Sequence, residues 1–289
     1  MGKKPYDKDY QKWIEEKLIR EATKRAQQVP SGVYSQRDNA HQVLLGKDKG
    51  WIQFGLMGDM HLCSKFSNEK GINEYFARMR DRGVKHIFSC GDNIDGMFVY
   101  RTQISDLKVI GSDAQVAYAA DFIDKNLPDG LIIHAITGNH EERAWEKIGV
   151  DTTKNLEQAL PKKFESLNNK QGCNMYATVF IRPMLTLDLL HGLRYCGERS
   201  APEYLLMKTV DGYKIHNQPD LLGVGHSHRI SRSNYRDCNS YLVGGFEYPN
   251  NFIARTRAGE DHGGWLIGLH TDDDKKINEI RESFIKVKS

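Results

Sequence analysis

Five short apolar runs in this chain each lead directly into residues of the types that bind metal ions. The runs are 51–57, 86–90, 131–137, 187–190 and 221–224. They are followed by Gly58-Asp59-Met60-His61, Gly91-Asp92-Asn93, Gly138-Asn139-His140-Glu141, His191-Gly192 and Gly225-His226-Ser227-His228. Because the carboxyl ends of strands in an open α/β sheet gather where binding sites form, this placement predicts one shared site.

The rest of the pattern also indicates an α/β fold, since apolar runs alternate with segments of helical periodicity. Strands are expected at 51–57, 86–90, 131–137, 177–181, 186–190, 221–224, 241–243 and 264–270. Helices are expected at 68–82, 113–126 and 153–160. With 289 residues, of which 39% are hydrophobic, the chain can bury a large core.

The first 50 residues have a different pattern. Apolar residues recur at helical spacing between Trp13 and Ala22, which predicts an amphipathic helix at 8–28. Pro30 and Gly32 end this pattern, and a polar stretch follows them. We therefore expect an N-terminal helix and linker at 1–50 and one catalytic domain at 51–289.

Charge and composition indicate the expected location of the protein and the kinds of partner that it can bind. A net charge of +3 permits contact with nucleic acid but falls short of a dedicated nucleic-acid binder. The sequence has neither an apolar run near the ~20 residues of a membrane span nor the apolar stretch of a secretory signal. We expect a cytoplasmic protein with no membrane contact. The cysteines contain no C-x-x-C pair and are expected to be free thiols: Cys63, Cys90, Cys173, Cys196 and Cys238.

Each motif alone has an ordinary structural explanation. Gly-Asp is a common turn, Asn139 fits a turn as well, and the pair His226 and His228 fits a solvated loop. A histidine within or ending an apolar run, as at His134 and His270, is more often a packed core residue. Five such motifs in a row, each after an apolar run, form a pattern that chance does not readily produce.

This ordered set of motifs resembles the calcineurin-like metallophosphoesterase superfamily over about 51–270. The resemblance implies a four-layer α-β-β-α sandwich of two mixed β-sheets flanked by helices, here with an N-terminal helical extension. It also implies two metal ions. Asp59, His61 and His228 would hold the first, Asn139, His191 and His226 the second, and Asp92 would bridge them.

Donors of these types suit two hard or borderline divalent cations. Imidazole, carboxylate and amide oxygen without thiolate favour Mn, with Fe, Ni, Zn and Mg as the alternatives. A bridging carboxylate can hold two cations about 3.5–4 Å apart, the separation at which a two-metal site clamps a phosphoryl group and activates water as hydroxide. The resemblance assigns His140 as the non-ligand histidine, and we expect it to be the general acid. Glu141 is expected to be a capping or supporting carboxylate.

The motifs favour a phosphodiesterase acting on nucleic acid or nucleotides. Ser/Thr protein phosphatases carry an arginine that binds the phosphate where this chain has Gly96. The motif Gly225-His226-Ser227-His228 resembles the Gly-His-x-His of phosphodiesterases and of SbcD-like nucleases of phage or bacterial type. One alternative is a phosphomonoesterase or protein phosphatase. The other is a non-catalytic subunit similar to polymerase accessory subunits, which the complete set of seven ligands and His140 disfavours.

Substrate contacts are expected from the second motif and from the apparent insertion at 98–115. This insertion resembles segments of calcineurin-like proteins that are described as nuclease-like or as similar to a DNA polymerase small subunit. Candidates are Asn93, Tyr100, which would stack on a base, and Arg101, which would hold a phosphate. Packing within a loop is an equally weighted explanation. Arg194, Glu198 and Arg199 follow His191 and are expected to line the pocket as well. Arg255 and Arg257 are expected to face either phosphate or solvent. The expected partner is a phosphodiester substrate, DNA or RNA, with homodimerisation through 8–28 left open.

Overall fold

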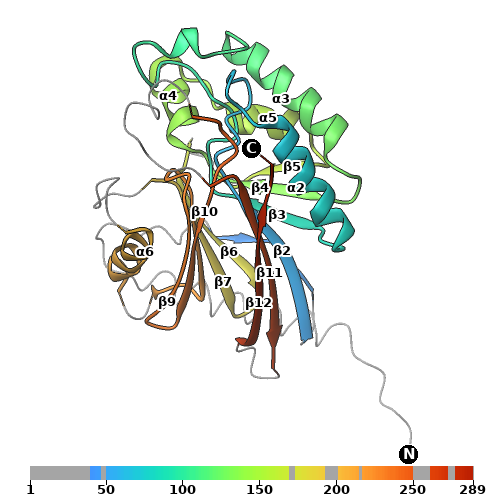
Figure 1. The fold of residues 1–289 in the computed structure, drawn as a ribbon, viewed down its shortest axis with the longest axis vertical. Coiled ribbons are helices and arrows are strands. Elements are labelled where there is room, and N and C mark those ends of the chain that lie inside the picture. Colours follow the sequence, from blue (N-terminus) through green and yellow to red (C-terminus); the bar gives the residue numbers. More distant parts are fainter. Residues whose placement is uncertain are drawn as a thin grey trace, which may run out of the picture.

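Two mixed six-stranded sheets lie face to face, with helices against their outer faces (Figure 1). The computed structural model describes residues 40–46, 50–168, 173–192, 201–214, 217–249, 261–272 and 277–288. The predicted helix at 8–28 lies outside these residues, as do Arg194, Cys196, Glu198, Arg199, Arg255 and Arg257. The layers of the described chain confirm the predicted α/β sandwich.

The first sheet, called sheet I, has the strand order β12-β11-β2-β3-β4-β5. Its strands are β2 (Gly50–Met57), β3 (His86–Ser89), β4 (Ile132–Ala135), β5 (Phe164–Ser166), β11 (Gly263–Thr271) and β12 (Ile277–Lys286). Strands β2 to β5 are parallel, whereas β11 is antiparallel to both β2 and β12. The parallel direction brings the carboxyl ends of β2, β3 and β4 to one edge of the sandwich.

The second sheet, called sheet II, has the order β1-β6-β7-β8-β10-β9. Its strands are β1 (His41–Gln42), β6 (Tyr176–Arg182), β7 (Leu185–Leu190), β8 (Leu221–Val224), β9 (Ile230–Tyr235) and β10 (Cys238–Val243). Strands β7 and β8 are parallel, so their carboxyl ends also lie together. Because β1 pairs with β6, the chain contributes to the sandwich from His41 onward. The domain division after residue 50 stays a prediction.

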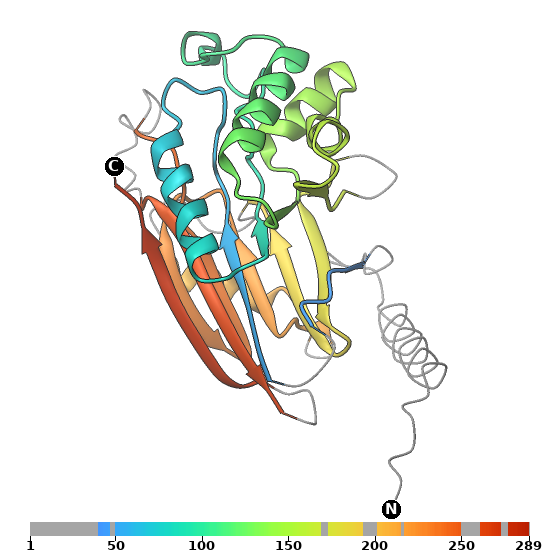
Figure 2. The same cartoon turned by 90° about the vertical axis from the view of Figure 1, so that its right-hand side faces the viewer.

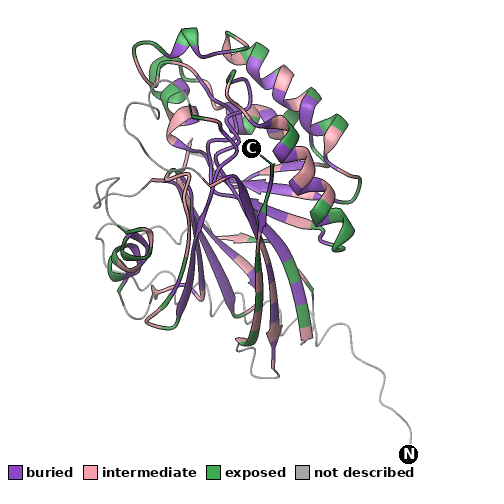
Figure 3. Cartoon of the chain, viewed as in Figure 1, coloured by how far each residue is buried: buried purple, intermediate pink, exposed green. Residues whose placement is uncertain are grey.

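The largest side chains of the inner layer fill the space between the sheets. Phe54 of sheet I meets Phe88 edge to face, with 5.4 Å between the ring centroids. Val179, Leu187 and Tyr241 of sheet II belong to the same buried cluster. Figure 3 shows the inner strands as almost entirely buried. Strands covered on both faces need apolar residues at successive positions, which explains the continuous apolar runs in the sequence.

Helices cover the outer faces of both sheets. Helices α2 (Glu69–Asp81), α3 (Ser112–Asn126) and α5 (Thr152–Ala159) share one buried cluster with the outer face of sheet I (Figure 2). Helix α6 (Pro202–Asp211) packs on sheet II, and α4 (Asn139–Ile148) contacts α5. None of the described helices combines the length and the hydropathy that a membrane crossing requires.

The eight predicted strands and three predicted helices are all present, with ends shifted by a few residues. The elements that the residue pattern did not predict are β1, β5, β9, β12, α4 and α6, together with the 3-10 turn η2 (Gln103–Ser105). Cys63, Cys90, Cys173 and Cys238 form no disulfide with one another, as expected for the described cysteines.

Helix α2 supplies a test of the fold. The Oδ1 atom of Asn68 accepts the N–H of Gly71 at 2.9 Å, and its Nδ2 donates to the carbonyl of Lys288 at 2.9 Å. Asn68→Ala removes both bonds, and a third that Oδ1 accepts from Tyr248 Oη at 3.0 Å, and should lower the free energy of unfolding by about 1–2 kcal/mol, measured by urea unfolding. Asn68→Asp keeps the cap acceptor and should recover part of the loss. Equal stability of Asn68→Ala and the unchanged protein would contradict this account.

Candidate metal centre and active site

The loops that carry the five motifs meet at the end of the sandwich where β2, β3, β4, β7 and β8 terminate. Asp59 and His61 follow β2, Asp92 follows β3, Asn139 and His140 open α4 after β4, His191 follows β7, and His226 and His228 follow β8. Both sheets therefore contribute predicted ligands to one place.

Five of these residues adopt a left-handed backbone conformation. The positive φ values are 54° at Asp59, 45° at His61, 51° at Asp92, 78° at His226 and 51° at His228. Such angles are uncommon for residues other than glycine and tend to cluster at functional sites, where the surrounding structure maintains them. The chain therefore turns sharply as it leaves β2, β3 and β8, and these turns aim the side chains inward.

Close backbone approaches explain two of the glycines that precede predicted ligands. A Cβ atom at Gly138 would collide with the carboxylate and backbone of Asp92, and a Cβ at Gly225 would lie 2.6 Å from the carbonyl oxygen of Cys90. Neither position has room for a side chain. Gly138 allows the loops after β3 and β4 to lie against each other, and Gly225 allows a loop of sheet II to lie against a loop of sheet I.

Asp59, His61 and His228 form the first group of donor atoms, all within 4.8 Å of one another. The Nε2 atom of His228 lies 3.4 Å from Asp59 Oδ1 and 3.2 Å from His61 Nε2. The carboxylate of Asp59 is buried and also accepts the backbone N–H of His226, at 2.9 and 3.0 Å from its two oxygens. The three side chains thus converge as the motifs predicted for the first metal.

Asp92, His191 and His226 form the second group within the same limit. The Nε2 atom of His191 lies 3.1 Å from Asp92 Oδ2 and 2.9 Å from Asn139 Oδ1. The Oδ2 atom of Asp92 is also 3.6 Å from His61 Nε2, which belongs to the first group. Asp92 therefore lies between the two groups, in the place of a bridging carboxylate.

Hydrogen bonds from Nδ1 to residues other than the seven predicted ligands orient two of the imidazoles. His61 Nδ1 is 3.1 Å from Asp95 Oδ1, and His191 Nδ1 is 2.7 Å from the carbonyl oxygen of Cys90. In each case Nδ1–H donates to an acceptor and leaves the lone pair of Nε2 directed at the cluster, as is usual for metal-binding histidines. The donor set and its orientation fit a pair of divalent cations. The assignment of the seven residues as ligands stays a proposal.

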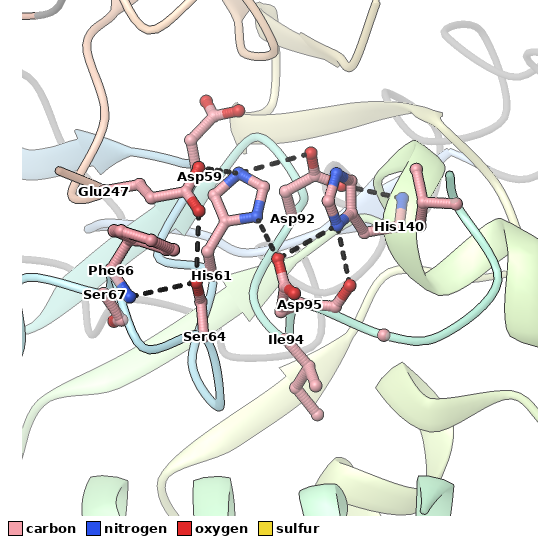
Figure 4. Close-up of polar contacts among 12 residues, drawn as sticks. Asp59, His61, Ser64, Phe66, Ser67, Asp92, Ile94, Asp95, His140 and Glu247 are labelled. Atoms are coloured by element: carbon pink, nitrogen blue, oxygen red, sulfur yellow. Dashed lines mark hydrogen bonds and ion pairs between the residues drawn. The ribbon is translucent and has the colours of Figure 1, made fainter. Parts of the chain in front are cut away.

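His140 lies beside the cluster and is held by two aspartates (Figure 4). Its backbone N–H donates to Asp92 Oδ1 at 3.0 Å. Its Nδ1 donates to the carbonyl oxygen of Asp95 at 2.7 Å and lies 3.2 Å from Oδ1 of the same residue. The ring stands edge-on to that of His61, with 4.5 Å between the centroids. These contacts hold Nδ1 on the side of Asp95.

Asp95 is a functional residue that the sequence reasoning missed. Its buried carboxylate lies between His61 and His140, and it is fixed in turn by Gln103, whose Nε2 donates to its carbonyl oxygen at 2.8 Å and to Oδ2 at 3.2 Å. The available signal was an aspartate three residues after Asp92, in Gly-Asp-Asn-Ile-Asp. Asp95 positions the two histidines.

Glu141 joins the second motif to the third. Its two carboxylate oxygens accept the backbone N–H groups of Asn93 at 2.6 Å, Ile94 at 2.9 Å and Gly138 at 2.8 Å. The side chain is fully buried. This is the supporting role that was expected for Glu141, because three backbone donors at the starts of two loops have no other partner there.

Buried carboxylates stabilise positive charge throughout the cluster. Burial alone lowers the pKa of His140, but the charge of Asp92 and the contacts with Asp95 outweigh it and raise that pKa to about 10. For His191 burial is likewise outweighed by Asp92, which raises the pKa to about 9. His226 differs, because burial and the neighbouring charge of His191 lower its pKa to about 4. The same negative potential would attract cations.

The three predicted substrate residues have other contacts. Asn93 is buried, accepts from Ser89 Oγ at 2.6 Å and donates to the carbonyl of Ile136 at 3.1 Å, so both ends of its amide are used within the fold. Tyr100 Oη donates to Asp106 Oδ2 at 2.9 Å, and Arg101 is exposed. Their substrate roles stay predictions, and the position of Asn93 does not favour its role.

Metal binding should release protons at pH 7. With a pKa of about 9, His191 is protonated at pH 7 without a cation, and it must lose that proton to become a ligand. The enthalpy of Mn²⁺ binding, measured by calorimetric titration in several buffers, should therefore depend on the ionisation enthalpy of the buffer. His86, outside the cluster, has a pKa of about 4, so His86→Gln should leave the proton count unchanged. A heat independent of the buffer would contradict the prediction.

A sequence profile of the calcineurin-like phosphoesterase family matches residues 52–252. The DNA polymerase II small subunit of Thermoplasma acidophilum is 24% identical over 211 residues, which are 62% of this chain and 42% of that protein. The chain thus spans less than half the length of this curated relative.

Solved structures with a related fold include an archaeal phosphodiesterase, with 17% identity and a TM-score of 0.43 over 81% of this chain and 100% of that one. A zinc complex of Vps29 from Entamoeba histolytica has 11% identity and a TM-score of 0.38 over 81% and 99%. The matched range of the family profile contains all five predicted metal motifs. The chain belongs to the calcineurin-like phosphoesterase family.

Proposed function

We propose that the protein is a metal-dependent phosphodiesterase that acts on nucleic acid or nucleotides. The observation that carries the proposal is the convergence of all seven predicted ligands with His140 at one end of the sandwich. The first cation would be held by Asp59, His61 and His228, the second by Asn139, His191 and His226, and Asp92 would be shared. Manganese is the proposed metal, with Fe, Ni, Zn and Mg as alternatives.

Bound divalent cations supply charge neutralisation at the phosphoryl oxygens and lower the pKa of a coordinated water. The protein's own part begins with Asp95, which holds the Nδ1 proton of His140 and so presents Nε2 to the substrate. Without cations, Asp92 and Asp95 raise the pKa of His140 to about 10. With Asp92 shared by two cations, the contacts with Asp95 would favour the protonated ring. His140 would then donate its Nε2 proton to the leaving oxygen when the bond to phosphorus breaks.

Gly96 supports a diester rather than a protein phosphatase substrate. It has a φ of 65°, and a Cβ atom there would collide with the carbonyl oxygen of His140. This backbone therefore has no room for the arginine with which protein phosphatases grip a phosphate at the corresponding position. A substrate must be held by other residues.

A non-catalytic role similar to that of a polymerase accessory subunit is the second candidate. It is favoured by the match to the DNA polymerase II small subunit of Thermoplasma acidophilum, at 24% identity. The proposal of catalysis rests on the retained ligands and on His140, which such a role does not require. DNA or RNA is the proposed partner under either function.

Substitution of His140 should separate catalysis from metal binding. His140→Ala removes the proton donor and should lower the rate of hydrolysis of bis-p-nitrophenyl phosphate by about 10²–10⁴-fold, with metal content retained. Asp92→Asn should lose both activity and metal, measured by elemental analysis. The control is His270→Ala on β11, where the ring contacts Asn278. A fully active His140→Ala enzyme would remove His140 from the mechanism.

Substrate preference tests the proposed function itself. With Mn²⁺, we expect faster hydrolysis of bis-p-nitrophenyl phosphate than of p-nitrophenyl phosphate, cleavage of a short single-stranded DNA, and loss of both activities with a chelator. Added Mn²⁺ should restore them. Preference for the monoester would favour a phosphatase, and inactivity of the metal-loaded protein on all three compounds would favour the accessory role.

A further inference from the structure

Three titratable side chains outside the metal centre form a chain of hydrogen bonds across the neighbouring strands β3, β4 and β5. His86 Nδ1 lies 2.9 Å from His134 Nε2, and His134 Nδ1 lies 2.7 Å from Oε2 of Glu165. The strand register places His134 directly opposite Phe88 on one side and Glu165 on the other. We call His86, His134 and Glu165 the histidine cluster.

The histidine cluster lies on the inner face of sheet I, which is turned toward sheet II. His134 is buried and stacks on Phe88 of the inter-sheet core, with 5.2 Å between the ring centroids. The ring of His86 stacks on His134 at the same centroid distance. The pair is thus packed between aromatic and apolar groups, where added charge is unfavourable.

The charges around the cluster oppose further protonation of its histidines. Glu165 is the carboxylate that attracts the protonated form of His86, of His134 and of His41 on β1. Its side chain is 45% exposed, so water screens part of its charge. The other groups that act on these histidines are cations: Lys85 acts on His86, and Lys154 on α5 acts on His41.

Burial lowers the pKa of His86 to about 4, and the charges of His134 and Lys85 act in the same direction. Burial also lowers the pKa of His41, against the attraction of Glu165. A histidine whose pKa falls on folding binds its proton more readily in the unfolded chain. Its contribution to stability is therefore complete above about pH 6.5 and is lost as the pH falls toward 4.

The spacing of the two rings independently limits how many protons the pair can hold. Because Glu165 accepts the Nδ1–H of His134, the neutral ring of His134 has a lone pair at Nε2, to which His86 Nδ1–H donates. One added proton fits, because His134 Nε2–H can donate to His86 Nδ1 when the hydrogen of His86 is on Nε2. Two added protons would set two N–H groups head to head across 2.9 Å.

We propose that the histidine cluster is a pH-sensitive contact that opens when a second proton reaches it and that thereby loosens the adjoining edge of the sandwich. This inference does not depend on the proposed function, since no member of the cluster is a predicted metal ligand. The edge is poised to open locally because β5 has 3 residues and β1 has 2, so few backbone bonds hold either strand.

His86→Gln is the first test, because a glutamine amide can donate to His134 Nε2 or accept from it and does not titrate. Urea unfolding between pH 6 and 5 should show that the unchanged protein takes up about one proton more on unfolding than His86→Gln. Its unfolding equilibrium constant should therefore rise by about tenfold more per pH unit of acidification. His270→Gln on β11 is the matched control. Equal pH dependence of His86→Gln and the unchanged protein would overturn the proposal.

Glu165→Gln gives a shift in the opposite direction. It keeps an acceptor for His134 Nδ1–H but removes the charge that compensates the first added proton. The stability of this variant should fall more steeply with acidification than that of the unchanged protein. A weaker or equal dependence on pH would contradict the role of the cluster. The side chain is half-exposed, so the substitution leaves the core intact.

Hydrogen exchange locates the opening. The amides of Ile133 and Leu167 join β4 to the segment of β5, and that of Val43 joins the segment after β1 to β6. At pH 5 these amides should exchange at least about fivefold faster in the unchanged protein than in His86→Gln, and at pH 7.5 equally fast. Amides of β11 should not differ. Equal exchange at pH 5, or the same increase throughout both sheets, would overturn the proposal of a local opening.

Discussion

The buried carboxylate of Asp92 is the centre on which the rest of the site depends. A carboxylate that is withdrawn from water needs nearby positive charge or hydrogen-bond donors. Here burial would raise the pKa of Asp92, but His191, His140 and His61 outweigh it and hold that pKa well below its usual value. The backbone N–H of His140 adds a direct donor. Without cations, protonated histidines meet this need, and with cations His61 and His191 would become neutral ligands. The charge balance and the metal site are thus one arrangement.

Holding this arrangement requires backbone conformations that are unfavourable on their own. Positive φ angles at Asp59, His61 and Asp92 are maintained because the loops are tied to each other and to buried strands. Glu141 links the second and third motifs through three backbone donors. The inter-sheet core around Phe54 and Phe88 fixes the strands from which the loops depart. Local strain at the site is therefore compensated by packing elsewhere.

Much of this could be predicted from the sequence, because strands buried on both faces are continuous apolar runs and each ends at a recognisable motif. The unpredicted elements lack such a signal. Strand β12 is an edge strand with mostly exposed or half-exposed residues, β9 is polar, and α4 is short and buries only Glu141 and Ala144, so few apolar residues mark it in the sequence. Asp95 was missed for another reason. It matters through its contacts with His61 and His140, which lie 34 and 45 positions away in the chain.

The bond from Gln103 to Asp95 has a consequence for how this protein can diverge. The segment at 97–111 has exposed apolar positions, among them Phe98, Ile104 and Ile110. Gln103 in the same segment is buried and holds the residue that orients His140. Related proteins can therefore vary the outer surface of this segment and, with it, the molecules that this surface contacts. The bonds from Gln103 to Asp95 require that such variation leave the position of His140 unchanged.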